Sequence, residues 1–547
     1  MTEKKHVSLK CVLVRCVLPA LLSGVLHALS FPNELWGPGL NFLAFIALVP
    51  VLYSVFTNNR RQAALSGFVY GASAYALFST FYAGTSATGL YFTLVFGHGL
   101  GYAALFYVFR CLDERMPVAG PFAMAFLHTA YGFLFVSKWW LAVSYGFLPY
   151  ALYRHPVFTQ ICDLVGVLGL LFIMTLTQIS IARLIRNRTW KTLKEPAVIA
   201  SGLIVVFQIV YGMVALKTWA ETMPDRTIKL GVIQPACGDF NKEYGTLEGW
   251  NLLKGQILEI SKEEPELIVS SETSFTYPIG WFDKYPVNRY GRPPKLDFFS
   301  FNDILSRQSA ASELLSIQKE TGVPILLGNV DITMNGECDP YPDGWESEYL
   351  QLNNAILIEN GEISSSYTKN HLAPMWETYP LTGIKAVREF YKSKEIKLYA
   401  AGKQTNSILF DGLRIGTPIC FEGHFPYICS GFKCDLFVSI GSNSYDQDGI
   451  GQLNDAIISS FRAIENRRTY VRVFNTGLSC MFDPTGKMIE KLPQHKRMTA
   501  VWNVDIYNRC TTLYSHCPDL LGWFSVAISL AAVIFLTVVR KKKKKEK

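Results

Sequence analysis

The sequence contains few charged residues and lacks the common cofactor-binding motifs. Only 18% of its 547 residues are Asp, Glu, Lys or Arg, whereas 50% are hydrophobic. This balance excludes an ordinary soluble enzyme along the whole chain and indicates membrane-spanning segments. No GxGxxG motif precedes an expected helix and no phosphate-binding P-loop motif occurs. We therefore predict no nucleotide cofactor.

Cysteine usage gives no sign of a metal site. The twelve cysteines are scattered, and no two of them have the CxxC spacing of zinc ligands. We therefore predict no bound metal. Cysteines between residues 217 and 519 could form disulfides in an oxidising compartment, but their spacing fixes no pairing.

Long hydrophobic runs are the first positive feature of the chain. Eight runs are long enough to cross about 30 Å of hydrocarbon. They lie at residues 11–30, 38–56, 63–82, 90–109, 119–137, 157–182, 197–216 and 520–539. The first run lacks a small-residue cleavage site near Leu29 to Asn33, and further runs follow it directly, so it does not have the pattern of a signal peptide. We predict seven transmembrane helices in a membrane domain over 1–220 and an eighth helix at 520–539.

Basic residues in alternate loops predict the orientation. They are Lys4, Lys5 and Lys10, then Arg60 and Arg61, Arg110 and Arg115, five residues between Arg183 and Lys194, and finally Arg540 with Lys541–Lys545. Alternate loops share one side of the membrane, and the positive-inside rule makes that side the cytoplasm. Residues 217–519 then lie outside, and the tail 540–547 is cytoplasmic.

The net charge of +8 could suggest nucleic acid as a partner. The lysine-rich tail offers a simpler explanation, because basic residues next to a span anchor it to lipid headgroups. We predict a membrane partner and no nucleic acid.

Residues 225–515 have the pattern of a folded external domain. Apolar strand-like runs alternate with helical stretches. We expect strands or strand pairs at 228–235, 267–270, 323–330, 354–364, 408–419, 435–440 and 470–487, and helices at 247–260, 303–319 and 452–467. This mixture indicates an α/β or α+β domain in which helices cover a sheet. The stretches 277–294 and 379–399 lack clean periodicity and are candidates for lids or membrane-interface loops, with plain surface loops as the alternative.

Glu272, Lys369 and Cys420 each end an apolar run of this domain. A carboxylate, an amine and a thiol are the groups that covalent acyl transfer needs. Each also has a simpler interpretation: a cysteine beside apolar residues is usually core filling, and a lysine at a strand end is usually solvated. An acid at the end of a buried strand is less ordinary, because it needs a partner.

The order Glu, Lys, Cys resembles the nitrilase (carbon–nitrogen hydrolase) superfamily. Segment Lys369–Glu377 (KNHLAPMWE) is similar to its lysine segment, and Ile419–Glu422 (ICFE) to the nucleophile segment of its membrane branch, the apolipoprotein N-acyltransferases. Leu29–Trp36, Arg462–Arg467 and Arg472–Gly477 also resemble segments of that branch, and seven spans, a nitrilase-like domain and one span is its layout. The resemblance covers essentially the whole chain.

The resemblance implies a fold and roles. The fold would be a polytopic α-helical membrane domain plus an external α/β nitrilase-like domain, an αββα sandwich. Glu272 would be the general base, Cys420 the nucleophile that forms a thioester, and Lys369 the oxyanion stabiliser together with the Phe421 backbone N–H. Glu377 would orient Lys369 or support the base, and Glu422 would fix the turn.

The resemblance also implies substrates and a location. A phospholipid would donate an acyl chain to the N-terminal amine of diacylglyceryl-cysteine on a lipoprotein, with no cofactor. The enzyme would be a monomer in the inner (cytoplasmic) membrane with its catalytic domain on the periplasmic side.

The chain departs from the branch at Ser270-Ser271, at Met375-Trp376 and at Ser442–Asp446. Three alternatives therefore stay open. One is a membrane-tethered amidase that uses water, although eight spans are many for a tether. Another is a transporter or scaffold, for which Asp163 is the one acidic residue within a predicted span. The third is a paralogue that acylates a different amine.

Overall fold

The computed structural model describes residues 9–83, 88–139, 142–237, 247–284, 301–334, 349–381, 384–394, 399–443, 449–507 and 511–545. Contacts divide the chain into two units. The first comprises Met1–Thr222, Leu453–Asn466 and Thr511–Lys547, and the second comprises Met223–Gln452 and Arg467–Cys510.

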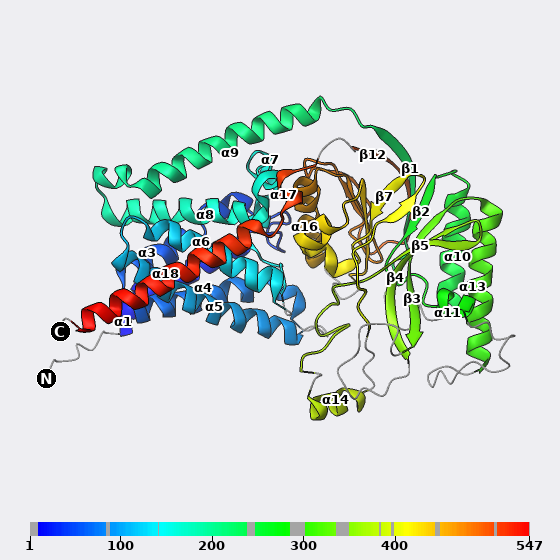
Figure 1. Ribbon diagram of the computed structural model, residues 1–547, viewed down its shortest axis with the longest axis horizontal. Coiled ribbons are helices and arrows are strands. Elements are labelled where there is room, and N and C mark those ends of the chain that lie inside the picture. Colours follow the sequence, from blue (N-terminus) through cyan, green and yellow to red (C-terminus); the bar gives the residue numbers. More distant parts are fainter. Residues whose placement is uncertain are drawn as a thin grey trace. The chain divides into compact units, whose positions relative to one another are not determined.

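The first unit is helical (Figure 1). Its helices are α1 (Leu9–Val12), α2 (Leu18–Ser30), α3 (Val49–Thr57), α4 (Arg60–Phe78), α5 (Thr88–Arg115), α6 (Gly120–Gly132), α7 (Pro156–Thr159), α8 (Cys162–Asn187), α9 (Pro196–Ala220), α17 (Leu513–His516) and α18 (Leu520–Lys545), together with most of α16 (Ile450–Asn466). Among the described residues, six helical segments are long and apolar enough to cross a membrane: Lys10–Ser30, Thr88–Arg115, Gly120–Lys138, Cys162–Asn187, Pro196–Ala220 and Leu520–Val538.

These six segments coincide with six of the eight predicted spans. The predicted span at 38–56 corresponds to a shorter apolar helical segment, Asn41–Thr57. The predicted span at 63–82 corresponds to α4, which is not among the six because arginines, serines and tyrosines dilute its hydropathy. The total of eight spans stays a prediction.

Helix α4 packs closely against α5 through two glycines one turn apart. A Cβ atom on Gly67 would lie 2.2 Å from the carbonyl oxygen of Tyr102, and one on Gly71 would lie 2.4 Å from that of His98. Small residues at this spacing let two membrane helices approach to backbone contact. Gly67 and Gly71 therefore bring the backbones of α4 and α5 into contact.

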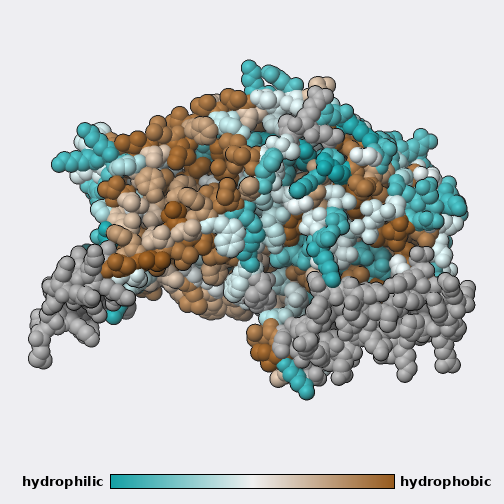
Figure 2. All heavy atoms as spheres, in the orientation of Figure 1, coloured by the Kyte–Doolittle hydropathy of each residue, from teal (hydrophilic) through white to brown (hydrophobic). Residues whose placement is uncertain are grey.

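The outer surface of this unit is apolar. Figure 2 shows hydrophobic side chains gathered over α9 and α18, where Leu203 and Ile534 are among the large exposed residues. Lipid tails can cover such side chains at no hydrophobic cost, so this surface suits a bilayer.

Helix α8 is interrupted near its start, and α16 compensates for the break. Gly166 has φ 65°, a left-handed conformation that ends regular helical bonding there. The next amide, Val167 N–H, donates to Glu465 Oε1 at 3.0 Å, and Glu465 also pairs with Arg462 at 2.9 Å. Both charged side chains are fully buried. Leu453–Asn466 therefore belongs to the first unit, although the domain predicted over 225–515 includes it.

The second unit contains two six-stranded sheets. The strands are β1 (Arg226–Gln234), β2 (Leu267–Ser270), β3 (Ile325–Met334), β4 (Tyr349–Glu359), β5 (Glu362–Thr368), β6 (Ile408–Phe410), β7 (Leu413–Gly416), β8 (Leu436–Gly441), β9 (Tyr470–Phe474), β10 (Cys480–Phe482), β11 (Met488–Lys491) and β12 (Met498–Ile506). The sheet orders are β12-β1-β2-β3-β4-β5 and β11-β10-β9-β8-β7-β6. In each sheet three parallel strands, β1-β2-β3 or β7-β8-β9, are flanked by antiparallel ones.

The strand pairs predicted at 354–364 and 408–419 are confirmed as antiparallel hairpins. Asn360 and Gly361 join β4 to β5 with φ values of 55° and 77°, and Asp411 and Gly412 join β6 to β7 with 43° and 75°. Positive φ at both central residues is the geometry that matches the twist of a hairpin. The predicted strand pair at 470–487 contains β9 and β10. A third strand, β11, follows after the turn at 484–486.

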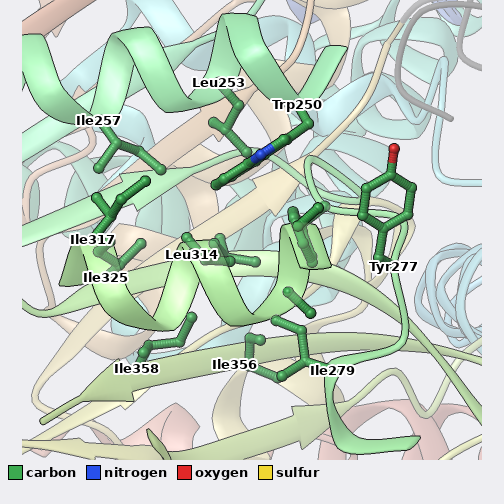
Figure 3. Packing of buried hydrophobic residues seen from close by; sticks show 14 of the residues in the cluster. Trp250, Leu253, Ile257, Tyr277, Ile279, Leu314, Ile317, Ile325, Ile356 and Ile358 are labelled. Carbon is green, nitrogen blue, oxygen red and sulfur yellow. The ribbon is translucent and has the colours of Figure 1, made fainter. Parts of the chain in front are cut away.

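Helices α10 (Leu247–Ser261) and α13 (Phe301–Thr321) cover the first sheet (Figure 3). Trp250, Leu253 and Ile257 from α10 recur every three or four residues and therefore share one face. They pack with Leu314 of α13 and Ile356 of β4 in one buried cluster. The predicted helices at 247–260 and 303–319 are thus confirmed.

Two short helices occupy stretches where irregular structure was expected. They are α11 (Ile279–Lys284) and α14 (Lys385–Lys392). Residues 285–300, 382–383 and 395–398 lie outside the described ranges. A lid role for either stretch stays a prediction.

Candidate active site

The strands of the second unit carry three predicted site residues at their carboxyl ends. Glu272 follows β2 by two residues, Lys369 directly follows β5, and Cys420 follows β7 by four. Glu272 and Lys369 are only 5% and 1% exposed. The simpler interpretation of Lys369 as a solvated surface residue is therefore wrong.

Lys369 lies between two carboxylates. Its Nζ is 3.2 Å from Glu272 Oε1, and 3.0 Å and 2.9 Å from the Oε1 and Oε2 atoms of Glu377. Burial alone would lower the pKa of Lys369, but Glu272, Glu377 and Cys420 together raise it well above its usual value. Lys369 is therefore a fixed positive charge in a buried site.

An asparagine joins the same cluster. Asn353 of β4 is buried, and its side-chain N–H₂ donates to Glu272 Oε1 at 2.7 Å and to Glu377 Oε1 at 2.8 Å. The backbone carbonyl oxygen of Asn353 accepts a hydrogen bond from the backbone N–H of Lys369 at 2.9 Å. Asn353 is not among the site residues predicted from the sequence. The available signal was a polar side chain inside an apolar strand.

A glycine on β3 lets the backbone of Glu272 approach closely. A Cβ atom on Gly328 would lie 2.4 Å from Thr273 N and 2.5 Å from Glu272 Cα. Only glycine leaves room for this approach. Gly328 therefore helps to set the position of Glu272 relative to the sheet.

Cys420 sits on a tight turn. Its φ of 52° is left-handed, which costs about 1 kcal/mol or more for a residue with a Cβ. A short 3₁₀-helix, Cys420–His424, begins at this residue, and the sulfur lies 3.8 Å from the carbonyl oxygen of Ser442. The side chain is half-buried. The Phe421 amide lies in the first turn, where helical amides lack intrahelical partners.

Glu422 fastens this turn to the lysine segment. Its Oε1 accepts hydrogen bonds from Tyr367 O–H at 2.8 Å and from the amides of Asn370 at 2.7 Å and His371 at 3.0 Å. Its Oε2 accepts from Ile419 N–H at 2.9 Å. Burial raises the pKa of Glu422 to about 7, and the hydrogen bonds oppose that rise. These hydrogen bonds join the turn to the lysine segment, and the role of Glu422 in fixing the turn stays a prediction.

The comparisons with known proteins agree with this architecture. Residues 23–180 match the apolipoprotein N-acyltransferase N-terminal domain, and residues 322–509 match the carbon–nitrogen hydrolase domain. Together the two ranges cover more than half of the chain. The chain belongs to the apolipoprotein N-acyltransferase family. It is accordingly a membrane protein with a nitrilase-like αββα domain.

Relatives of this family match nearly end to end. Apolipoprotein N-acyltransferase 1 of Treponema denticola is 26% identical, over 95% of this chain and 96% of its own length. The apolipoprotein N-acyltransferase of Geobacter metallireducens is also 26% identical, over 96% of both chains. Among solved structures, a carbon–nitrogen hydrolase of Helicobacter pylori is 16% identical over 51% of this chain and 89% of its own, with a TM-score of 0.33.

The structure describes most of the positions at which the chain departs from the apolipoprotein N-acyltransferase pattern. Ser270 and Ser271 are fully buried behind Glu272. Met375 is half-exposed with φ 67°, and the exposed Trp376 follows it. The backbone carbonyl oxygen of Ser442 lies near the sulfur of Cys420. Residues 444–446 lie outside the described ranges. The ion pairs of Lys369 with Glu272 and Glu377 are present despite the departures that the structure describes.

The arrangement supplies the parts of a thiol-based acyl transfer. Lys369 is in direct contact with both Glu272 and Glu377, and Cys420 is one of the groups that raise the pKa of Lys369. Phe421, the residue after Cys420, lies half-buried in an aromatic group with His371, His424 and Phe425. An acid, a fixed cation and a thiol at one place can activate a nucleophile and stabilise an oxyanion.

Proposed function

We propose that this protein transfers an acyl chain from a phospholipid to the N-terminal amine of diacylglyceryl-cysteine on lipoproteins, through a thioester on Cys420. The observation that carries the proposal is the buried Lys369 between Glu272 and Glu377, with Cys420 among the groups that raise the pKa of Lys369. Full-length relatives named apolipoprotein N-acyltransferase support the substrate classes.

The first half-reaction forms the thioester. Glu272 takes the proton of the Cys420 thiol, and the thiolate attacks the ester carbonyl carbon of the phospholipid. The tetrahedral intermediate collapses with cleavage of the bond between the carbonyl carbon and the glycerol oxygen. That oxygen takes the proton back from Glu272, and a lysophospholipid leaves.

The second half-reaction consumes the thioester. The acceptor amine attacks the thioester carbonyl, and Glu272 takes the proton that the nitrogen loses. The carbon–sulfur bond breaks, the sulfur of Cys420 recovers a proton, and an amide leaves. An ester and an amine thus become an amide and an alcohol, with no net proton and no cofactor.

Lys369 stabilises both tetrahedral oxyanions, with the Phe421 amide as the second donor. Two carboxylates keep Lys369 charged, and its burial strengthens the interaction because little water screens it. A charged donor that is already fixed needs no reorganisation during the reaction.

The proposed location is the inner membrane, with the second unit on the periplasmic side, the tail in the cytoplasm and the enzyme as a monomer. The alternation of basic loops supports this orientation. Both lipid substrates would then be in the leaflet that faces the catalytic unit.

The test is a mass measurement on the purified full-length protein in detergent. We would add phospholipid and a diacylglyceryl-cysteine peptide and compare wild type with Cys420→Ala. We expect one added acyl chain on the peptide with wild type only, and an acyl-thioester on Cys420 when the peptide is omitted. Release of free fatty acid without peptide acylation would indicate the amidase-like alternative with water as acceptor. A Cys420 thioester that persists with the peptide would indicate a different amine. No acylation of folded protein or peptide would refute the transferase proposal.

A further inference from the structure

The two glutamates beside Lys369 have different numbers of partners. Both oxygens of Glu377 are used: Oε1 contacts Asn353 and Lys369, and Oε2 contacts Lys369 and the Ala373 amide, at 2.7 Å for the amide. In Glu272, Oε1 contacts Asn353 and Lys369. Within the described part of the chain, Glu272 Oε2 has no partner. The two carboxylates are therefore not equivalent as proton acceptors.

The orientation of the Asn353 amide is fixed by its neighbours. Each of its two N–H bonds points to a different carboxylate, at 2.7 Å and 2.8 Å. The flipped amide would place its oxygen against two carboxylate oxygens, which repel it. The oxygen Oδ1 is buried and lacks a hydrogen-bond partner among the described residues. A buried unpaired acceptor costs about 1–3 kcal/mol, so the contacts to the carboxylates dominate this conformation.

We propose that Asn353 is a positioning residue that makes Glu272, rather than Glu377, the base. Its amide holds Oε1 of Glu272, which leaves Oε2 available to take the thiol proton. The same amide helps to saturate Glu377, which is left to hold Lys369. This inference deepens the proposed function and rests on it for the identity of the acyl donor.

The hydrogen bonds of Asn353 also affect protonation of the cluster. An amide that donates to two carboxylates favours their charged forms, and two carboxylates without it tend to share a proton. Loss of the amide should therefore make the cluster retain a proton at higher pH. Activation of Cys420 would then need a higher pH.

The test measures Cys420 reactivity without any lipid. Full-length wild type, Asn353→Ala and Asn353→Asp are treated with iodoacetamide across pH 5–9, and alkylation is followed by the mass of the Cys420 peptide. In Asn353→Ala we expect the rate to fall about 10- to 100-fold at neutral pH, and the rise of the rate profile to move up by about one pH unit.

The Asn353→Asp variant separates hydrogen bonding from packing. Asp has nearly the size of Asn, so a purely packing role predicts wild-type reactivity for Asp and a loss for Ala. The proposed role predicts that Asp is at least as impaired as Ala, because it adds a third carboxylate. Wild-type reactivity and pH profile in Asn353→Asp, or an unshifted profile in Asn353→Ala, would overturn the proposal.

Asn354→Ala is the matched control. Asn354 is the next residue of β4, faces the opposite side, and accepts a hydrogen bond from Thr368 Oγ1 at 2.8 Å. We expect its pH profile to have the wild-type shape. If the Ala and Asp variants at 353 do not fold, Asn353→Ser, which keeps one donor, should give an intermediate shift; an unshifted profile in a folded Ser variant would overturn the proposal.

Failure of this inference is distinguishable from failure of the proposed function. Alkylation needs no phospholipid and no peptide, so the role of Asn353 is measured even if wild type acylates nothing. Conversely, peptide acylation by wild type would stand even if the Asn353 variants behaved like wild type.

Discussion

Glu272 and Glu377 contact the same ammonium group, but replacing each should have a different effect. Glu272→Gln removes the proposed base, and general-base catalysis contributes about 10²–10⁴-fold. Glu377→Gln leaves the proposed base in place, but its new amide N–H₂ group faces the N–H donors of Lys369, Asn353 and Ala373. We expect this change to misplace Lys369 and to lower the rate about 10- to 100-fold.

The measurement is the rate of thioester formation on Cys420, followed by intact mass. The thermal unfolding temperature of each variant serves as a control for folding. A larger loss in Glu377→Gln than in Glu272→Gln would reverse the roles assigned to the two acids.

Glu422 should make stability depend on pH. Its pKa is raised from 4.5 to about 7 by burial, so the folded state binds this proton more tightly than the unfolded state does. The contribution is fully present below about pH 4.5 and is lost as pH rises through about 7. At about 1.4 kcal/mol per unit of pKa, this is on the order of 3 kcal/mol.

We therefore expect the unfolding temperature of wild type in detergent to fall between pH 5 and pH 8 by more than that of Glu422→Gln, which does not titrate. Parallel pH dependence in the two proteins would contradict the assignment.

Among the secondary-structure elements, strand β3 lies close to the backbone of the residues that follow β2, and Gly328 makes this close packing possible. In Gly328→Ala the new Cβ would collide with the backbone of Glu272 and Thr273, which cannot rotate away as a side chain could. We expect thioester formation to slow about 100-fold while the protein still folds.

Gly255→Ala is the control for this substitution. Gly255 lies in α10 with open space around its Cβ position, so alanine should stabilise the helix by about 0.5–1 kcal/mol and leave activity unchanged. Equal activity of Gly328→Ala and wild type would show that the close approach is not needed.

The strands that carry the site were predictable because they are short apolar runs ended by turn residues. Asn360-Gly361 and Asp411-Gly412 indicate two hairpins, because Asn-Gly and Asp-Gly pairs readily adopt the positive φ angles that a tight hairpin turn needs. Strand β12 was not predicted, because buried and exposed residues do not alternate regularly along it. Its partner β1 is also distant in the sequence: the paired residues Thr227 and Asp505 are 278 positions apart. Local pattern carries no information on such a distant partner.

The site was predictable only in part. Glu272, Lys369 and Cys420 follow recognisable runs, and the lysine segment includes Glu377. Asn353 was missed because its function depends on lying opposite Lys369 across the β4–β5 pair. The grouping of α16 with the membrane helices depends on buried contacts of Arg462 and Glu465, which resemble an ordinary surface pair in the sequence.

At the scale of the whole molecule, the orientation can be tested with a native cysteine. Cys517 is exposed and lies just before the last span. With the predicted orientation, a membrane-impermeant maleimide should label it in right-side-out spheroplasts and not in inverted vesicles.

The label is read from the mass of the Cys517 peptide. Detergent-solubilised protein should be labelled from either preparation and serves as the control. Labelling confined to inverted vesicles would place the catalytic unit in the cytoplasm and refute the orientation.

The break in α8 has a consequence for how the protein is made. The group that caps Val167 belongs to Glu465, a residue translated almost 300 positions later, and α18 comes later still. During synthesis the amide of Val167 therefore lacks this partner until residue 465 has been made, and by then strands β1 to β8 have already been translated. Ribosome-bound chains stopped before residue 465 should hold α8 less firmly than chains stopped after α16, so the order of assembly is set by the far end of the gene product.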